Sequence, residues 1–132
     1  MVTLTTRSPA LRDDCLSCAR PTRWVRKAVL YMRRGGDTVS IHAGDTLLAV
    51  AYFWPCREGC LEFCLSLRPE ARTHMHALVR LAQLRLEEIT HTGKRVETHV
   101  RPGHRPGERM ARLTGFVPDR RTPGCWVYLW RL

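Results

Sequence analysis

One long segment of the chain repeats apolar residues every three or four positions, which is the spacing of a helix with one buried face. The stripe lies within residues 73–91 and consists of Met75, Leu78, Val79, Ala82, Leu86 and Ile89. Thr73 precedes it as a side chain that caps helices, and Gly93 follows it as a residue that ends them. The pattern therefore predicts a helix over 73–91 with Thr73 as its N-cap.

Three shorter segments carry weaker helical signals. Ser8 and Pro9 are typical of an N-cap and a first helical position, and "ALRDDCLSCA" follows them. The stretch "RPTRWVRKAVLYMRRG" spaces its apolar residues three and four apart and ends at Gly35 and Gly36. A last, short helix is expected to end near Gly115.

Strand patterns fill most of the remaining chain. The run at 46–54 is continuously apolar, which predicts burial on both faces, and Pro55 is expected to stop it. Residues 60–67 alternate, with Leu61 and Phe63 on one side and Glu62 on the other. Strands are expected at 2–6, 38–43, 46–54, 60–67, 94–100 and 125–132.

The order of these elements predicts the fold class. Three strands joined by hairpins precede a strand–helix–strand crossover, and such a crossover makes its two strands parallel. A chain of 132 residues is the usual size of one domain. We expect a single α/β domain over 1–132 with a mixed, mostly antiparallel central sheet and helices on both faces.

Charge adds a preference for anions. The chain has 22 basic and 12 acidic residues, a formal net charge of +10 and a pI of about 10.2. Such a surface attracts nucleic acid, an anionic membrane or a phosphorylated cofactor, although the charges form no block and could simply be spread over solvated faces. No segment is long enough to span a membrane and no signal-peptide pattern is present, so we expect a cytoplasmic protein without a membrane partner.

Six cysteines raise the question of a metal site. Cys15 and Cys18 form a CxxC pair, and three more recur at every fourth residue from Cys56 to Cys64. With the histidines at 74 and 76 a zinc site is conceivable, but no second pair stands at zinc-ribbon spacing. We expect free thiols in a reducing compartment and no metal.

The segment "RPEARTHMHA", between the strand at 60–67 and the long helix, has the layout of a phosphate-binding turn. Backbone N–H groups at a helix N-terminus carry a partial positive charge and bind anions. Arg72, His74 and His76 could add charge or donors. Met75 stands where a glycine usually lets the backbone approach the phosphate, so the segment is either a working turn or a relic of one.

Together with "HVRPGHRPGERMARLTGF" (99–116), this order of elements resembles the GNAT family of acyl-CoA-dependent N-acetyltransferases over roughly residues 1–130. It is most similar to small GNAT-like proteins of tailed phages, which share the "LAVAYFW" strand and the ending. The resemblance implies a GNAT-like sheet with a splay between its fourth and fifth strands, acetyl-CoA bound in that splay as co-substrate, and an acceptor amine on a protein or small molecule.

The resemblance also assigns cofactor-binding residues. In the family, pantetheine pairs with the fourth strand and the pyrophosphate rests on a Gln/Arg-x-x-Gly-x-Gly/Ala turn, which Arg72 and Ala77 match and Met75 breaks. In the last helical segment, His104 takes the place of a common Asn and Ala111 that of a Tyr which is often the general acid. The implied cofactor-binding residues are Phe63, Leu65, Leu67, Arg72, Thr73, His74, Met75, His76, Ala77 and His104.

Acetylation of an amine needs a base, a polarised carbonyl and an acid for the leaving thiolate. Glu62, on the fourth strand among apolar neighbours, is the best candidate base, or else a partner of one of the arginines. His99 could act directly or through water, or be structural. Tyr128 could replace the missing acid, or be a core aromatic residue.

Two other functions stay open at this point. Met75 and the absent tyrosine favour a catalytically inactive GNAT-fold phage protein that joins a virion or binds a host factor, in the host cytoplasm or in the particle. Nucleic-acid binding is supported by charge alone, because no strand combines basic residues with a base-stacking aromatic pair. The acceptor amine has no signal in the sequence.

Overall fold

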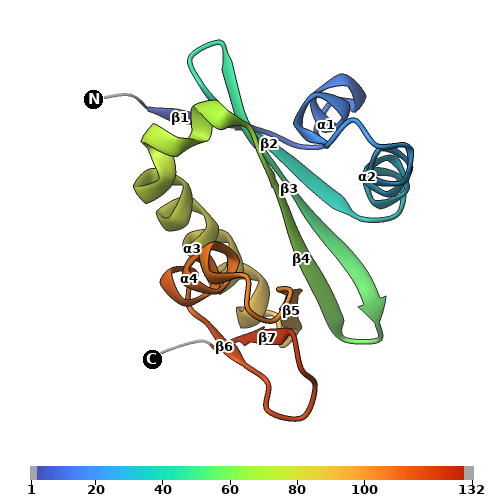
Figure 1. Cartoon of the computed structure of the whole chain (residues 1–132), viewed down its shortest axis with the longest axis vertical. Coiled ribbons are helices and arrows are strands. Elements are labelled where there is room, and N and C mark those ends of the chain that lie inside the picture. The colour runs from blue at the N-terminus through green and yellow to red at the C-terminus, as the bar shows by residue number, and fades with distance from the viewer. Residues whose placement is uncertain (1–2, 130–132) are drawn as a thin grey trace. The chain divides into compact units, whose positions relative to one another are not determined.

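The computed structural model describes residues 3–129 (Figure 1). Its elements follow one another as β1 (Leu4–Arg7), α1 (Arg12–Cys18), α2 (Arg23–Gly35), β2 (Asp37–Ala43), β3 (Thr46–Arg57), β4 (Cys60–Leu67), the 3-10 helix η1 (Pro69–His74), α3 (Met75–His91), β5 (Arg95–His99), α4 (Arg105–Thr114), β6 (Phe116–Pro118) and β7 (Cys125–Tyr128). Residue 2 of the first predicted strand and residues 130–132 of the last one lie outside the described part of the chain.

The described strands form one sheet in the order β1-β2-β3-β4-β5-β7-β6. β1 and β2, β2 and β3, β5 and β7, and β6 and β7 pair antiparallel, whereas β4 and β5 pair parallel. The predicted α/β fold with a mixed, mostly antiparallel sheet is thus confirmed. The structure adds β6, whose three residues are too few to show an alternating pattern in the sequence.

Two compact units divide the chain. The first comprises Met1–Trp54 and Cys64–Met75, and the second comprises Pro55–Phe63 and His76–Leu132. β3 and β4 each run from one unit into the other along the chain. The expectation of a single domain stays a prediction.

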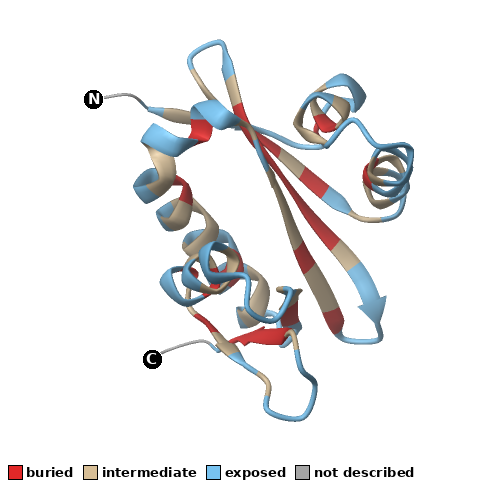
Figure 2. Cartoon of the chain, viewed as in Figure 1, coloured by how far each residue is buried: buried red, intermediate tan, exposed pale blue. Residues whose placement is uncertain are grey.

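The core of the first unit lies where α1 and α2 pack on β3. Ala10, Cys15, Val29, Val50 and Tyr52 form its buried cluster. Residues 48–53 of β3 are all buried, as the apolar run predicts (Figure 2). In α2 only one part of the predicted stripe faces this core: Val25, Val29 and Met32 pack there, whereas Trp24, Ala28 and Tyr31 are exposed.

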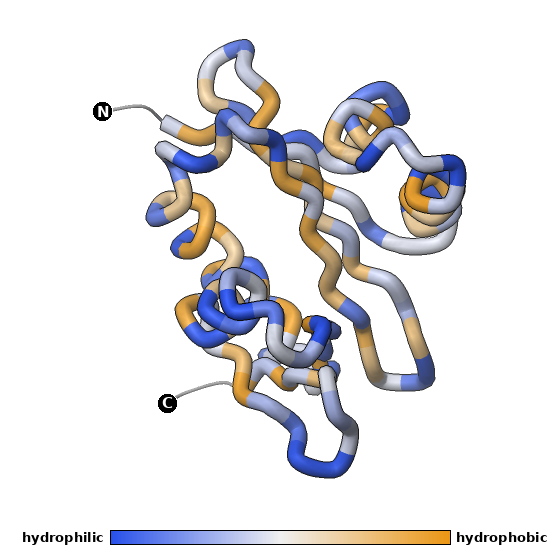
Figure 3. The backbone as a smooth tube through the Cα atoms, viewed as in Figure 1, coloured by the Kyte–Doolittle hydropathy of each residue, from blue (hydrophilic) through white to orange (hydrophobic). Residues whose placement is uncertain are grey.

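The prediction that Pro55 stops a strand is wrong, because β3 continues to Arg57. The pairing of β2 with β3 ends at Asp37 and Phe53. Pro55 therefore lies beyond β2, and its missing N–H removes no hydrogen bond on that side, which is the situation in which strands tolerate proline. The turns at the ends of the β3–β4 and β6–β7 hairpins are hydrophilic (Figure 3).

The predicted start of the first helix is also wrong. α1 begins at Arg12, and its N-cap residue Leu11 makes no side-chain capping bond. Ser8 instead donates from Oγ to the Thr38 carbonyl at 2.9 Å, and the Ala10 N–H donates to Thr38 Oγ1 at 2.9 Å. These bonds attach residues 8–10 to β2, so Ser8 is not available to cap the helix.

Replacing Thr38 with valine is expected to lower the free energy of unfolding by about 1–2 kcal/mol, because the buried Ala10 N–H loses its acceptor while the side-chain shape is kept. Urea unfolding of both proteins measures the difference. Ser40→Ala is the matched control on the same strand: Ser40 is equally buried, but its Oγ lies 3.5 Å from the Arg7 carbonyl and makes a weak bond. A Thr38→Val protein as stable as Ser40→Ala would contradict the prediction.

The core of the second unit is aromatic. Phe63 stacks on Phe116 with ring centroids 6.0 Å apart, and Phe116 meets Tyr128 edge-on at 5.6 Å. Gly115, before Phe116, has a φ of +117°, and a Cβ there would lie 3.0 Å from the Tyr128 ring. Glycine is thus required at this position for its backbone conformation and for space. Among the described helices, none is long and apolar enough to cross a membrane.

Candidate functional site

The parallel pairing of β4 with β5 is short. Its register joins Cys60 to Arg95, Leu61 to Val96 and Glu62 to Glu97, although β4 continues to Leu67. At the next position the Thr98 hydroxyl donates to the Phe63 carbonyl at 2.8 Å. Backbone pairing that ends this early is what the predicted splay between the fourth and fifth strands requires.

Glu62 and His99 meet where this pairing ends. Glu62 is opposite Glu97, and His99 follows two residues later on the same face of β5. His99 Nδ1 lies 2.9 Å from Glu62 Oε1, with 52% of the His99 side chain and 28% of the Glu62 side chain exposed. The structure therefore brings together the two residues that the sequence proposed separately as bases. With its Nδ1 on a carboxylate, the imidazole can keep Nε2 as an accessible base.

Arginines pair with Glu97, whereas Glu62 pairs with His99. Glu97 is buried, and it accepts hydrogen bonds from Arg57 and, at 2.8 Å, from Arg95 Nε. Burial alone would raise the pKa of Glu97, but the two guanidinium groups outweigh it and hold the pKa below its usual range. Asp119 binds the other end of Arg95 at 3.2 Å. The role of Glu97 could not be predicted from the sequence, where its only signal is a carboxylate inside a predicted strand.

The six cysteines are free thiols. Cys56 and Cys60 are in contact, with their Sγ atoms 3.3 Å apart, and burial together with this contact raises the pKa of Cys60 to about 12. Within the described residues, two groups of three side chains have the spacing to hold a metal ion: Cys56, Cys60 and Glu97, and Glu97, His99 and Cys125. Both share Glu97, whose charge Arg57 and Arg95 already balance.

The segment after β4 is anchored through Arg68. Its N–H donates to the Leu48 carbonyl at 2.9 Å, its Nε donates to Glu70 at 3.0 Å, and its Nη1 donates to the Ser17 carbonyl at 3.1 Å. The hydrogen bond from Arg68 lowers the pKa of Glu70. These bonds fix the start of η1, so the "PE" of the predicted phosphate turn has a structural role.

The prediction that Thr73 caps the long helix is wrong. η1 covers Pro69–His74, and α3 follows directly from Met75, which has right-handed helical angles of −59° and −39°. Pro69 at the first position favours this early start because its φ is already helical. In a 3-10 helix the N–H groups after the first turn bond to carbonyls three residues back. The donors that this segment offers an anion are therefore mainly side chains, led by the exposed Arg72.

His104 has a structural role at the start of α4. As its N-cap, His104 accepts a hydrogen bond at Nδ1 from the Gly107 N–H at 3.2 Å. A Cβ on Gly107 would lie 2.6 Å from that nitrogen, so the cap needs glycine there. Ala111, at the position of the family's tyrosine, is buried. Tyr128 is buried as well, in the aromatic core beside Phe116, which agrees with the second reading of that residue.

The other cofactor-binding candidates differ in exposure. Phe63 is buried, and its carbonyl is the acceptor of the Thr98 hydroxyl. Those with a half-buried side chain are Leu65, His74 and Met75, and those with an exposed one are Leu67, Arg72, Thr73, His76 and Ala77. No phosphate contact is implied by exposure alone, and their role stays a prediction.

Known proteins resemble this chain in structure but not in sequence. No family model matches the chain, and no curated protein matches it. Among solved structures, Ard1 from Thermoplasma volcanium superposes with a TM-score of 0.71 at 13% identity, covering 98% of this chain and 100% of that chain. An acetyltransferase of Bacillus subtilis in complex with CoA gives 0.67 at 13%, covering 95% of each chain.

A third structure, an acetyltransferase of the GNAT family from Desulfovibrio desulfuricans, gives a TM-score of 0.67 at 14% identity and covers 95% of this chain and 96% of that chain. At these identities the likeness establishes the fold, which is that of the GNAT acetyltransferases. In this chain, that fold includes the short parallel pairing of β4 with β5 and the helix that follows β4.

Proposed function

We propose that this protein transfers an acetyl group from acetyl-CoA to an amine, with His99 as the base. The observation that carries the proposal is the Glu62–His99 pair, which lies where the parallel pairing of β4 and β5 ends, in a chain with the GNAT fold. A partly exposed imidazole whose second nitrogen faces a carboxylate is the usual arrangement of a general base. Two of the structures with this fold are an acetyltransferase with CoA and an acetyltransferase with acetyl-CoA.

In the proposed reaction, the neutral acceptor amine, which has lost its ammonium proton to solvent, attacks the thioester carbonyl carbon, and His99 Nε2 takes a proton from the nitrogen as the nitrogen–carbon bond forms. The resulting tetrahedral intermediate collapses, and the carbon–sulfur bond breaks. The CoA thiolate leaves and receives the proton back from the His99 imidazolium, so no second acid is needed. Glu62 positions the imidazole and balances its transient charge. Because one histidine serves as both base and acid, the reaction does not need a tyrosine as acid. In this chain Tyr128 is a core residue, and Ala111 replaces the family's tyrosine.

The residues after β4 fit a ligand that carries phosphates. Arg72 and His74 are donors or cations within one turn of η1, and Arg68, which anchors that turn, is already committed to Glu70 and Ser17. We propose that Arg72 and His74 bind the pyrophosphate of CoA, and that the backbone of Phe63, Leu65 and Leu67 pairs with pantetheine. The side chains thereby replace the contribution of the glycine that Met75 displaced.

Replacing Arg72 with glutamine is expected to weaken acetyl-CoA binding about tenfold, because one charge-assisted hydrogen bond to a phosphate is lost. Isothermal titration calorimetry with acetyl-CoA measures the dissociation constant. Arg80→Gln is the matched control, since Arg80 is an exposed arginine further along α3 and its loss changes the net charge equally. If acetyl-CoA gives no heat and no thermal shift with the unmodified protein, the acetyltransferase proposal fails.

A second candidate is a binding protein that has kept the fold without the reaction, either in a virion or on a host protein. Met75 in the turn and Ala111 at the tyrosine position favour it. The two candidates differ in one measurement, which is acetylation of a panel of amines, including peptide N-termini and polyamines. Turnover that His99→Ala lowers strongly selects the enzyme, whereas CoA-independent capture by a partner without any turnover selects the binding protein.

A further inference from the structure

The helix α2 has an unusual exposed surface. It contains Arg23, Arg26, Lys27, Arg33 and Arg34 and no acidic residue. Trp24 is 82% exposed, and Tyr31, seven residues later, is 67% exposed. Because a helix repeats its direction every seven residues, Trp24 and Tyr31 lie on the same side, with Lys27 between them. A tryptophan this exposed gains nothing from the core, and its position among cations points to a ligand with flat and anionic parts.

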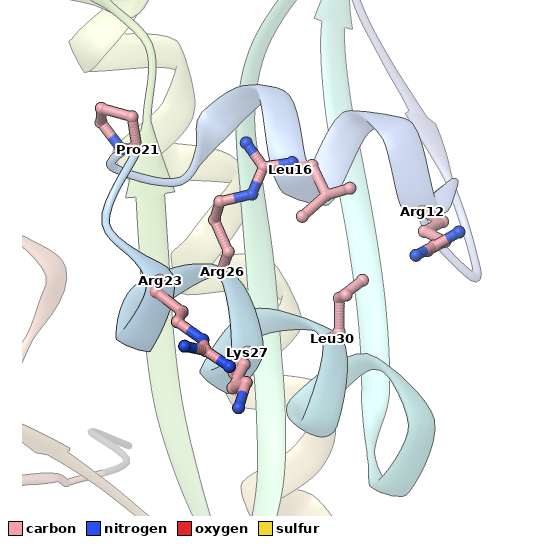
Figure 4. A pocket seen from close by; sticks show the side chains of 7 residues that line it. All are labelled: Arg12, Leu16, Pro21, Arg23, Arg26, Lys27 and Leu30. Carbon is pink, nitrogen blue, oxygen red and sulfur yellow. The ribbon is translucent and has the colours of Figure 1, made fainter.

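A pocket borders this surface. It is open to solvent and has a volume of about 420 Å³ (Figure 4). Its lining consists of Arg12 and Leu16 of α1, Pro21 of the connecting turn, and Arg23, Arg26, Lys27 and Leu30 of α2. Arg26 extends from α2 towards α1 beside Leu16, and Leu30 points to the same gap. No carboxylate of residues 3–129 lies within ion-pair distance of the four cations that line the pocket. Their charge is therefore available to an anionic ligand.

Tyr31 packs against Trp54. The centroids of the two rings lie 4.9 Å apart, with a tilt of 41° between the planes. Gly35 makes room for this arrangement, because a Cβ at Gly35 would lie 2.5 Å from Trp54. A ring that already packs against a neighbour loses less entropy than an isolated one when a flat ligand stacks on it.

We propose that α2 is a binding site for single-stranded nucleic acid. Trp24 and Tyr31 stack on unpaired bases, Arg23 and Lys27 contact the backbone phosphates, and the pocket between α1 and α2 receives a further phosphate. Single strands are favoured over duplexes because a duplex hides the faces of its bases, so the aromatic rings would have nothing to stack on. An acidic peptide would satisfy the cations but would leave the two aromatic rings without a flat partner.

The test is fluorescence anisotropy of a short fluorescein-labelled oligothymidylate titrated with the full chain. We expect Trp24→Ala to weaken binding about tenfold, as for one lost base stack. The double variant Arg23→Gln/Lys27→Gln should weaken binding and reduce the slope of log K against log salt concentration by about 1.4, which is the effect of two phosphates on a single strand. Trp24 is exposed, so Trp24→Ala should keep the melting temperature of the unmodified protein.

The matched control is Arg120→Gln/Arg121→Gln, which removes two exposed cations from the hairpin between β6 and β7. It should change the affinity less than twofold. If this control weakens binding as much as Arg23→Gln/Lys27→Gln, the attraction is a property of the net charge and the proposal is overturned. A duplex that binds as tightly as the single strand, or polyglutamate that competes equally well, would overturn it too. A Trp24→Ala protein that binds as tightly as the unmodified protein would also overturn the proposal.

Discussion

Replacing His99 with alanine is expected to lower kcat for acetyl transfer about 100- to 1,000-fold and to leave the KM for acetyl-CoA nearly unchanged. The magnitude is that of a general base whose proton transfer must be taken over by water. The KM should hold because the residues proposed to bind CoA are on β4 and η1, whereas His99 is the last residue of β5. Steady-state kinetics with an acceptor amine and a thiol-detecting reagent measure both constants.

Two further observations separate a base from a structural histidine. Added imidazole should restore part of the activity of His99→Ala, because a small base can occupy the space that the side chain leaves. Glu62→Gln should lower kcat about tenfold without a response to imidazole, since the histidine is present but no longer held by a carboxylate 2.9 Å away. A His99→Ala protein that is folded and fully active would show that the base lies elsewhere.

Replacing Glu97 with glutamine is expected to lower the free energy of unfolding by about 2–3 kcal/mol at neutral pH. Glu97 is buried and accepts hydrogen bonds from Arg57 and Arg95, and charged hydrogen bonds of this kind are costly to lose. The cost stays below that of a fully buried pair because both arginine side chains are partly exposed and can return to water. Chemical denaturation measures it.

The lowered pKa of Glu97 determines how its contribution to stability changes with pH. The pKa of Glu97 is lower in the folded chain than in the unfolded chain, so its ionised form stabilises the fold at every pH above its ordinary, unfolded value. That stabilisation is lost as the pH falls through the lowered, folded pKa. The difference between the unmodified protein and Glu97→Gln should therefore be constant near neutrality and shrink in acid. Glu88→Gln, which removes an exposed partner of Arg85 on α3, is the control and should cost only a few tenths of a kcal/mol at neutral pH.

The elements that depend on short-range patterns could be predicted from the sequence. The stripe of α3 and the continuous apolar run of β3 are confirmed, because burial on one or both faces leaves a period in the chain. The element ends were predicted less well. Ser8 was assigned to cap α1, yet Thr38, thirty residues away, binds it, and no local pattern contains that competition. Pro55 is predicted to stop a strand, but β2, the neighbour that would lose a hydrogen bond to proline, has already ended at that point.

The same distinction holds for the candidate site. The resemblance to the GNAT family pointed to the fourth strand, where Glu62 is a carboxylate among apolar neighbours, and His99 was a histidine on a neighbouring strand. Their contact depends on the parallel register of β4 and β5, which the sequence does not encode locally. Glu97 was missed for the related reason that its two arginines come from the β3–β4 hairpin and from its own strand. The exposure of Trp24 could not be predicted, because periodicity does not reveal which side of a short helix is covered.

The packing around Gly115 changes what the "GF" ending can be taken to mean. Gly115 adopts a backbone conformation that other residues avoid and sits against Tyr128, while Phe116 lies between Phe63 and Tyr128. Both residues are therefore maintained by the architecture of their unit, whatever reaction the molecule performs. A chain of this fold that had lost its chemistry would need this dipeptide as much as an active one, so the dipeptide carries no information about turnover.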